Sequence, residues 1–207
     1  MKKIIMILVS LATISFVSAT NITVGGRESI GLGIGTTIED GAKDSGFGEL
    51  KLSDSFDYGI TAFGKIDVAG GFAMQSELSF DVIYTGLKGS SGEAKAALNV
   101  ISFAALAMYD IALGNRITLS PFAGPQVGYV LGKVKMSGDL EESCKVKEPM
   151  IFDLVFGTAG AYKTGNGALL ADIRYNFGLT TITNKSADSK LYTPKNLILG
   201  LGYQIRL

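Results

Sequence analysis

The sequence contains no histidine and no tryptophan, and it has one cysteine and four prolines in 207 residues. Without histidine, the chain cannot build a Ser–His or Cys–His nucleophile pair, a histidine metal site or a histidine general base. The single cysteine, Cys144, cannot form a disulfide within its own chain. We therefore expect no enzymatic activity, no cofactor and no metal site, and we expect stability to come from a large core or a closed sheet.

Charge is also scarce. Only 18% of residues are charged, and 19 basic residues balance 19 acidic ones. This balance argues against nucleic-acid binding, which needs a basic patch. The mean hydropathy is high, at +0.31. Even so, no interior segment approaches the ~18 consecutive apolar residues of a membrane-spanning helix. The length fits one domain.

The N-terminus has the pattern of a secretory signal peptide. Two lysines precede an apolar run over residues 4–17, and small residues follow it up to Ala19. A basic start, a short apolar segment and a small-residue cleavage site are typical of such signals. We predict a cleaved signal peptide over residues 1–19 and one β-barrel domain over residues 20–207.

Most of the remaining chain alternates apolar and polar residues with a period of two, which predicts β-strands. The clearest segment is ALLADIRYNFGL at residues 168–179. One face of this strand is fully apolar, whereas the other carries Asp172, Arg174 and Asn176. A strand buried on both faces would be apolar throughout. The same pattern predicts eight strands, over residues 27–36, 58–68, 72–84, 94–110, 116–131, 150–163, 168–179 and 196–207.

Two of these strands are irregular. In the strand over residues 94–110 both faces carry apolar residues, and a bulge or register change is expected there. We take its apolar face to be Leu98, Val100, Ala104, Leu106 and Met108. In the strand over residues 116–131, Pro121 and Pro125 each remove a ladder donor, which predicts a local bulge or irregular pairing.

The connections alternate in length. Long segments follow the first, third, fifth and seventh strands, and tight turns follow the others. Outer-membrane barrels have this rhythm, with long outer loops and short periplasmic turns. Strands of about ten residues also suit a tilted crossing of a bilayer. The expected fold is all-β, an eight-stranded antiparallel up-and-down transmembrane β-barrel with both termini periplasmic. Its long loops are residues 37–57, 85–93, 132–149 and 180–195.

Three features indicate that the apolar faces meet lipid. We find no acid or base within the apolar face of any predicted strand. The opposite faces are dominated by small residues with sparse charges of both signs, which suits the narrow interior of a barrel of ~8 strands. Aromatic residues gather near the strand ends, as in the interfacial girdles of membrane barrels. The expected girdle is Tyr58, Phe72, Tyr84, Tyr129, Phe152, Tyr162, Phe177 and Tyr203.

The polar faces predict an interior network of ion pairs, because charges of both signs must satisfy one another inside a closed barrel. A filled and paired interior leaves no wide channel. The expected members are Lys65, Asp67, Glu77, Asp81, Arg116, Asp153, Asp172, Arg174 and Arg206.

Two segments carry a family resemblance. The segment from Asp172 to Leu179, DIRYNFGL, resembles the penultimate-strand R-Y-x-x-G-L pattern of PorT-like outer-membrane β-barrel proteins. The segment from Ser120 to Tyr129 resembles the fifth strand of the same group. More distantly, the chain is similar to OmpX-like and opacity-type surface proteins. The resemblance implies residence in the outer membrane of a diderm bacterium and folding by the barrel-assembly machinery.

The leading functional interpretation is a structural or surface-interaction role, adhesion-like, through the outer loops. The acidic loop over residues 37–57 matches no calcium-loop spacing, so we interpret it as a solvated loop. A narrow pore for small solutes is an alternative. A second alternative is a soluble periplasmic lipid-binding barrel, in which the apolar faces would point inward.

Overall fold

The computed structural model describes residues 21–33, 51–89, 92–138, 143–145, 149–180, 182–183, 190–192 and 195–207. The predicted signal peptide over residues 1–19, most of the loop over residues 37–57 and parts of the other long connections lie outside the described residues. Within the described part, no helix is long and apolar enough to cross a membrane.

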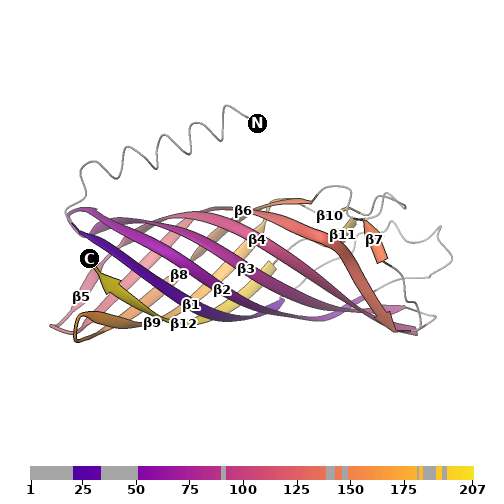
Figure 1. Cartoon of the computed structure of the whole chain (residues 1–207), viewed down its shortest axis with the longest axis horizontal. Helices are drawn as coiled ribbons and strands as arrows, with labels where there is room; N and C mark the ends of the chain where they lie inside the picture. The colour runs from indigo at the N-terminus through magenta and orange to yellow at the C-terminus, as the bar shows by residue number, and fades with distance from the viewer. Residues whose placement is uncertain are drawn as a thin grey trace, which may run out of the picture.

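Eight strands form the wall of a closed antiparallel barrel (Figure 1). Each pairs with the next in chain order, and β12 returns to pair with β1. This confirms the predicted fold class. The wall strands are β1 (Ile22–Gly33), β2 (Lys51–Ala69), β3 (Phe72–Gly89), β4 (Gly92–Tyr109), β6 (Ile117–Gly138), β8 (Met150–Thr164), β9 (Gly167–Gly178) and β12 (Lys195–Arg206).

Four short strands complete the described part. β5 (Ile111–Leu113) continues β4 along β6, and β7 (Ser143–Lys145) pairs with the far end of β6. β10 (Ile182–Thr183) and β11 (Lys190–Tyr192) pair with each other. We call the end of the barrel with β7 the loop side, and the opposite end, with the tight turns, the turn side.

The turn side holds both ends of the described chain. The Leu207 backbone N–H donates to the carbonyl of Ile22 at 2.8 Å, which ties the last strand to the first. Glycines with positive φ make the tight turns, among them Gly114 at 77°, a conformation that side chains with a Cβ rarely adopt. The pairing of β12 with β1 therefore closes the sheet around the barrel in the part of the wall that these strands share, as a hydrocarbon environment requires.

Several strands are longer than the alternation predicted. β1 begins at Ile22 rather than at residue 27, and β2 begins at Lys51 rather than at residue 58. β3 and β4 stay paired up to Gly89 and Gly92, so most of the predicted loop over residues 85–93 is strand. The prediction relied on apolar side chains, but the backbone ladder continues past the apolar band, where no side-chain pattern marks it.

The outside of the barrel is apolar. Large hydrophobic side chains point outward on every wall strand, with exposures such as 70% for Leu201, 58% for Leu78 and 57% for Leu169. Several charged side chains of the same strands lie inside, among them Arg27, Glu77, Asp153, Asp172 and Arg174. A soluble barrel would have the reverse arrangement, so the soluble lipid-binding alternative is wrong.

The predicted orientation of β4 is wrong. Leu98 and Leu106 face the interior, with 5% and 1% exposure, whereas Ile101 and Phe103 face outward with 41% and 42%. Val100, Ala104 and Met108 are also interior. Both faces of this strand are apolar, so the alternation could not choose between them, and pairing with β3 and β6 decides. The expected register change is present between Ala97 and Asn99.

The interior is consequently not lined by small and charged residues alone. A buried apolar cluster fills part of the lumen on the turn side. Its members are Phe63, Ala73, Ala104, Leu106, Met108, Phe122, Val155, Ala159 and Leu170. This cluster fills space that the small residues would have left open.

One acid faces outward, contrary to the prediction that the apolar faces carry no charge. Glu28 is exposed and lies between Ile60 of β2 and Leu201 of β12. The alternation predicts a strand that starts at residue 27, so that this acid lies at its edge. Because β1 begins at Ile22, Glu28 lies in mid-strand.

The two prolines of β6 do not shift its register. The β6–β8 ladder runs without interruption through Pro121 and Pro125. On the other side, the pairing with β4 is interrupted between Gln126 and Ala123 and resumes in the same register. The irregular pairing expected near the prolines is therefore present on the β4 side of β6. The alternative, a bulge at the prolines, is not found in these two ladders.

Candidate functional site

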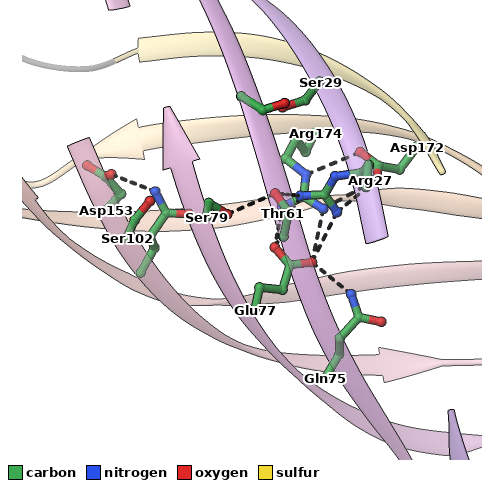
Figure 2. A network of polar contacts seen from close by, with 12 residues as sticks. Arg27, Ser29, Thr61, Gln75, Glu77, Ser79, Ser102, Asp153, Asp172 and Arg174 are labelled. Carbon is green, nitrogen blue, oxygen red and sulfur yellow. Dashed lines mark hydrogen bonds and ion pairs between the residues drawn. The ribbon is translucent and has the colours of Figure 1, made fainter. Parts of the chain in front are cut away.

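A cluster of four charged residues crosses the middle of the lumen. Arg27 comes from β1, Glu77 from β3, and Asp172 and Arg174 from β9 (Figure 2). β3 and β9 lie four strands apart in either direction around the wall, so their side chains meet across the full width of the barrel. All four point inward because they alternate with outward-facing residues of their strands.

The contacts within this central cluster form a closed set. Arg174 Nη1 donates to Glu77 Oε2 at 2.7 Å, and Arg27 Nη1 donates to Glu77 Oε1 at 3.1 Å. Asp172 lies 3.0 Å from Arg27 Nη1 and 3.2 Å from Arg174 Nε. Each arginine therefore contacts both acids, and each acid contacts both arginines.

Neutral groups add hydrogen bonds to the central cluster. Gln75 Nε2 donates to Glu77 Oε1 at 2.7 Å, and Arg27 Nη2 donates to the Thr61 hydroxyl at 3.1 Å. The Arg174 guanidinium lies 5.1 Å from the ring centroid of Phe122. Such contacts offset the cost of removing charges from water.

Burial of the central cluster is nearly complete. The exposed fractions are 5% for Arg27, 2% for Glu77, 6% for Asp172 and 4% for Arg174. Two positive and two negative charges cancel. A buried charge that lost its partner would be costly, so the cluster is held together as a unit. Gly200 leaves room for it, because a Cβ at this position would lie 2.4 Å from Arg27 Cδ.

The central cluster separates two spaces. On the turn side lies a vestibule of about 600 Å³, and toward the loop side lies a chamber of about 50 Å³. Arg174 lines both. The cluster therefore acts as a partition across the lumen.

Charged groups also line the turn-side vestibule. Lys65 donates to Asp110, and Ser120 donates to the same carboxylate at 2.6 Å. Arg206 lies 3.8 Å from Asp67, with 60% and 36% of their side chains exposed. The side chains of these pairs are more exposed to solvent than those of the central cluster, so the pairs contribute less to stability.

The structure separates the predicted network residues into three groups. Glu77, Asp172 and Arg174 form the central cluster. Lys65, Asp67, Arg116 and Arg206 line the turn-side vestibule. Asp81 and Asp153 line the loop-side chamber.

Three participants were not predicted. The alternation places Arg27 at the start of a strand, Asp57 in a loop and Asp110 at the end of a strand. Arg27 shares the alternation of Ser29 and Gly31, so the sequence pattern contained the signal for its inward position. Asp57 likewise alternates with Phe56 and Tyr58, so the sequence pattern also contained the signal for its inward position.

The eight predicted girdle residues all face outward. Their exposures range from 41% for Phe177 to 62% for Phe72. Phe72 also packs edge-on against Tyr109, with ring centroids 4.9 Å apart.

A closed antiparallel sheet with an apolar outside and a charged, paired inside defines a transmembrane β-barrel of the outer-membrane class. The protein is an outer-membrane β-barrel, embedded in the lipid bilayer through its apolar outer surface. Barrels of this class reside in the outer membranes of diderm bacteria.

Comparison with known proteins agrees on the fold. No family model matches the chain, and no curated protein matches it significantly. The structure is similar to the outer membrane protein OprG from Pseudomonas aeruginosa, with a TM-score of 0.58 and 14% identity, over 92% of this chain and 97% of that one. It is also similar to Neisserial surface protein A (NspA), with a TM-score of 0.52 and 15% identity, over 89% of this chain and 96% of that one. At this level of identity the likeness concerns the fold alone.

Proposed function

We propose that this protein is a closed surface barrel, whose loop-side strands and loops contact a negatively charged partner outside the cell. The observation that supports this most is the length of the strands on one side. β2, β3, β4 and β6 have 19, 18, 18 and 22 residues, whereas β1, β9 and β12 have 12 each. About 9–11 residues suffice to cross a bilayer, so four neighbouring strands extend well beyond it.

We call this loop-side extension the raised sheet, made of residues 51–55, 85–89, 92–97, 131–138 and 143–145. Figure 1 shows it at one end of the barrel, around the far ends of β3, β4 and β6. Its backbone pairing continues as far as Ala94 opposite Gly138 and Lys133 opposite Lys145. A sheet that stands clear of lipid is a suitable platform for a partner.

The raised sheet is basic. It contains six lysines (Lys51, Lys88, Lys95, Lys133, Lys135 and Lys145) and two acids (Asp54 and Glu93). Lys51 is directly opposite Lys88, and Lys133 is directly opposite Lys145. This excess of lysines in the sequence of the raised sheet would favour an anionic partner.

The filled lumen supports a surface role over transport. The central cluster and the buried apolar cluster occupy the interior, and we propose that the protein neither conducts solutes nor catalyses a reaction. A narrow pore is the second candidate, favoured by the turn-side vestibule of about 600 Å³. It would require the central cluster to open.

The route to the membrane is part of the same proposal. Export would use the signal peptide over residues 1–19, and insertion would use the barrel-assembly machinery. The PorT-like family remains our proposed relationship, based on the segment from Arg174 to Leu179. The eight outward aromatic residues would anchor the barrel at the two membrane surfaces.

Binding to an anionic polymer tests the proposed function. Purified barrel in detergent is applied to immobilised dextran sulfate and to neutral dextran. We expect salt-dependent retention on dextran sulfate only. The double variants Lys51→Gln/Lys88→Gln and Lys133→Gln/Lys145→Gln should bind several-fold more weakly, whereas Lys163→Gln, at an exposed turn-side lysine, should bind like the parent.

Two results would count against this assignment. One is no retention of the parent protein at low salt. The other is an equal loss of binding in Lys163→Gln, which would mean that overall charge and not the raised sheet determines retention.

A further inference from the structure

The turn-side vestibule is a blind cavity. Residues of the turn between β8 and β9 and the last residue, Leu207, line its mouth, and Asp172 and Arg174 of the central cluster line its inner end. Its volume of about 600 Å³ lies within the range of about 300–1,000 Å³ that is typical of small-molecule sites. The vestibule is therefore large enough for a small organic ligand, which could enter only from the turn side.

One half of the vestibule wall is polar. Arg206 of β12 is directly opposite Thr23 of β1. Thr23 is opposite Lys65 of β2, which is in turn opposite Gln75 of β3. All four residues line the vestibule. Four neighbouring strands thus present a row of polar side chains in register, which we call the polar row.

The other half of the wall is largely apolar toward its inner end. Met108 of β4 is opposite Phe122 of β6, and Ala161 of β8 is opposite Leu170 of β9. These residues also line the vestibule, and they belong to the buried apolar cluster or pack against it. Ser120 of β6 interrupts this half nearer the mouth. The cavity is therefore amphipathic, with the polar row facing an apolar wall.

The charged groups of the vestibule leave an excess of positive charge. Asp172 and Arg174 belong to the central cluster, in which the charges cancel. The other charged lining residues are four cations and two acids, namely Lys65, Arg116, Lys163, Arg206, Asp67 and Asp110.

The contacts of these residues do not remove the excess. Lys65 contacts both Asp67 and Asp110, and Arg206 contacts Asp67. Within the described part of the chain, Arg116 and Lys163 form no ion pair. Arg116 donates instead to the neutral Tyr162 hydroxyl, at 3.2 Å. A cleft lined by an excess of one charge raises the local concentration of ligands of the opposite charge, so the vestibule favours an anion.

We propose that the turn-side vestibule binds a small organic carboxylate with an apolar body. The carboxylate lies toward the polar row, and the body packs against the wall that contains Phe122 and Leu170, where its burial is favourable. Because the central cluster closes the inner end, the ligand enters and leaves on the same side. The raised sheet lies at the opposite end of the barrel, so this site does not depend on the proposed function.

Binding of para-fluorobenzoate, followed by fluorine NMR, tests the site. The folded barrel in detergent micelles is titrated with this anion, and empty micelles give the background. We expect saturable binding of one equivalent and several-fold weaker binding of the neutral analogue para-fluorobenzamide. Unlabelled benzoate should displace the probe, whereas inorganic phosphate at equal ionic strength should not.

Two variants probe the two halves of the wall. Arg206→Gln removes a charge from the polar row, and Ala161→Phe fills space on the apolar side. Each should weaken binding several-fold. The control Lys195→Gln removes a charge near Phe177, at the loop-side start of β12, and should bind like the parent. Heat-dependent mobility in SDS shows whether each variant is folded.

Four results would overturn the proposal. The first is no saturable binding by the parent protein. The second is equal binding of para-fluorobenzamide, because the positive charge would then play no part. The third is displacement by phosphate as effective as by benzoate, because the apolar wall would then play no part. The fourth is unchanged binding in folded Ala161→Phe, or an equal loss in Arg206→Gln and Lys195→Gln, because the anion would then lie outside the vestibule.

Discussion

Replacement of Glu77 by glutamine tests the central cluster directly. Glu77 accepts hydrogen bonds from both Arg27 and Arg174 and is 2% exposed. Glutamine keeps the shape but removes the charge, so two buried guanidinium groups would face Asp172 alone. Removing one partner of a buried ion pair costs about 3–5 kcal/mol. With a urea dependence of about 2 kcal/mol per M, the unfolding midpoint in urea should fall by roughly 2 M.

The assay is equilibrium unfolding in lipid vesicles, followed by tyrosine fluorescence and heat-dependent mobility. Asp67→Asn is the matched control. Arg206 lies 3.8 Å from Asp67 with both side chains substantially exposed, and Lys65 lies 4.0 Å away, so the loss of this charge should cost about 1 kcal/mol or less. If Glu77→Gln is no more destabilising than this control, the central cluster is not a buried, mutually dependent unit and the reasoning fails.

Three further predictions concern single substitutions in the barrel wall. Gly200→Ala should destabilise the barrel by about 1–3 kcal/mol through overpacking. The control is Gly64→Ala, because a Cβ at Gly64 meets nothing within 4 Å. This control should be nearly neutral in the same urea titration. Leu106→Ala should cost about 2–5 kcal/mol because this side chain is 1% exposed inside the lumen, and a cost equal to that of lipid-facing Leu201→Ala would place Leu106 outside the core. Glu28→Leu should stabilise the protein by about 1–2 kcal/mol, because a charge on the lipid face is unfavourable, and a loss of stability would indicate that Glu28 has a partner in the membrane.

Much of the fold could be predicted from the sequence because the lipid-crossing parts of the strands have one dominant pattern. In β9, apolar and polar residues alternate from Ala171 to Asn176, and the structure places them outside and inside accordingly. The apolar outside face is required by lipid, so the alternation is a physical constraint there. Beyond the lipid this constraint ends, and the start of β2 at Lys51 could not be predicted.

The interior was harder to predict because its residues meet partners from distant strands. Glu77 and Arg174 are 97 positions apart in sequence, and no local pattern pairs them. The inward orientation of Leu106 was also hidden, since an apolar residue is acceptable both in lipid and in a packed lumen. Only the pairing of β4 with its neighbours determines which face it presents.

Conductance across a planar lipid bilayer tests the closed-barrel account most directly. The sample is purified protein whose mobility in SDS changes on boiling, which establishes that the barrel is folded. The account predicts no steady unitary current, because the central cluster and the buried apolar cluster fill the lumen between the turn-side vestibule and the loop side. A stable unitary current from the parent protein would contradict it and would make the narrow pore the better description.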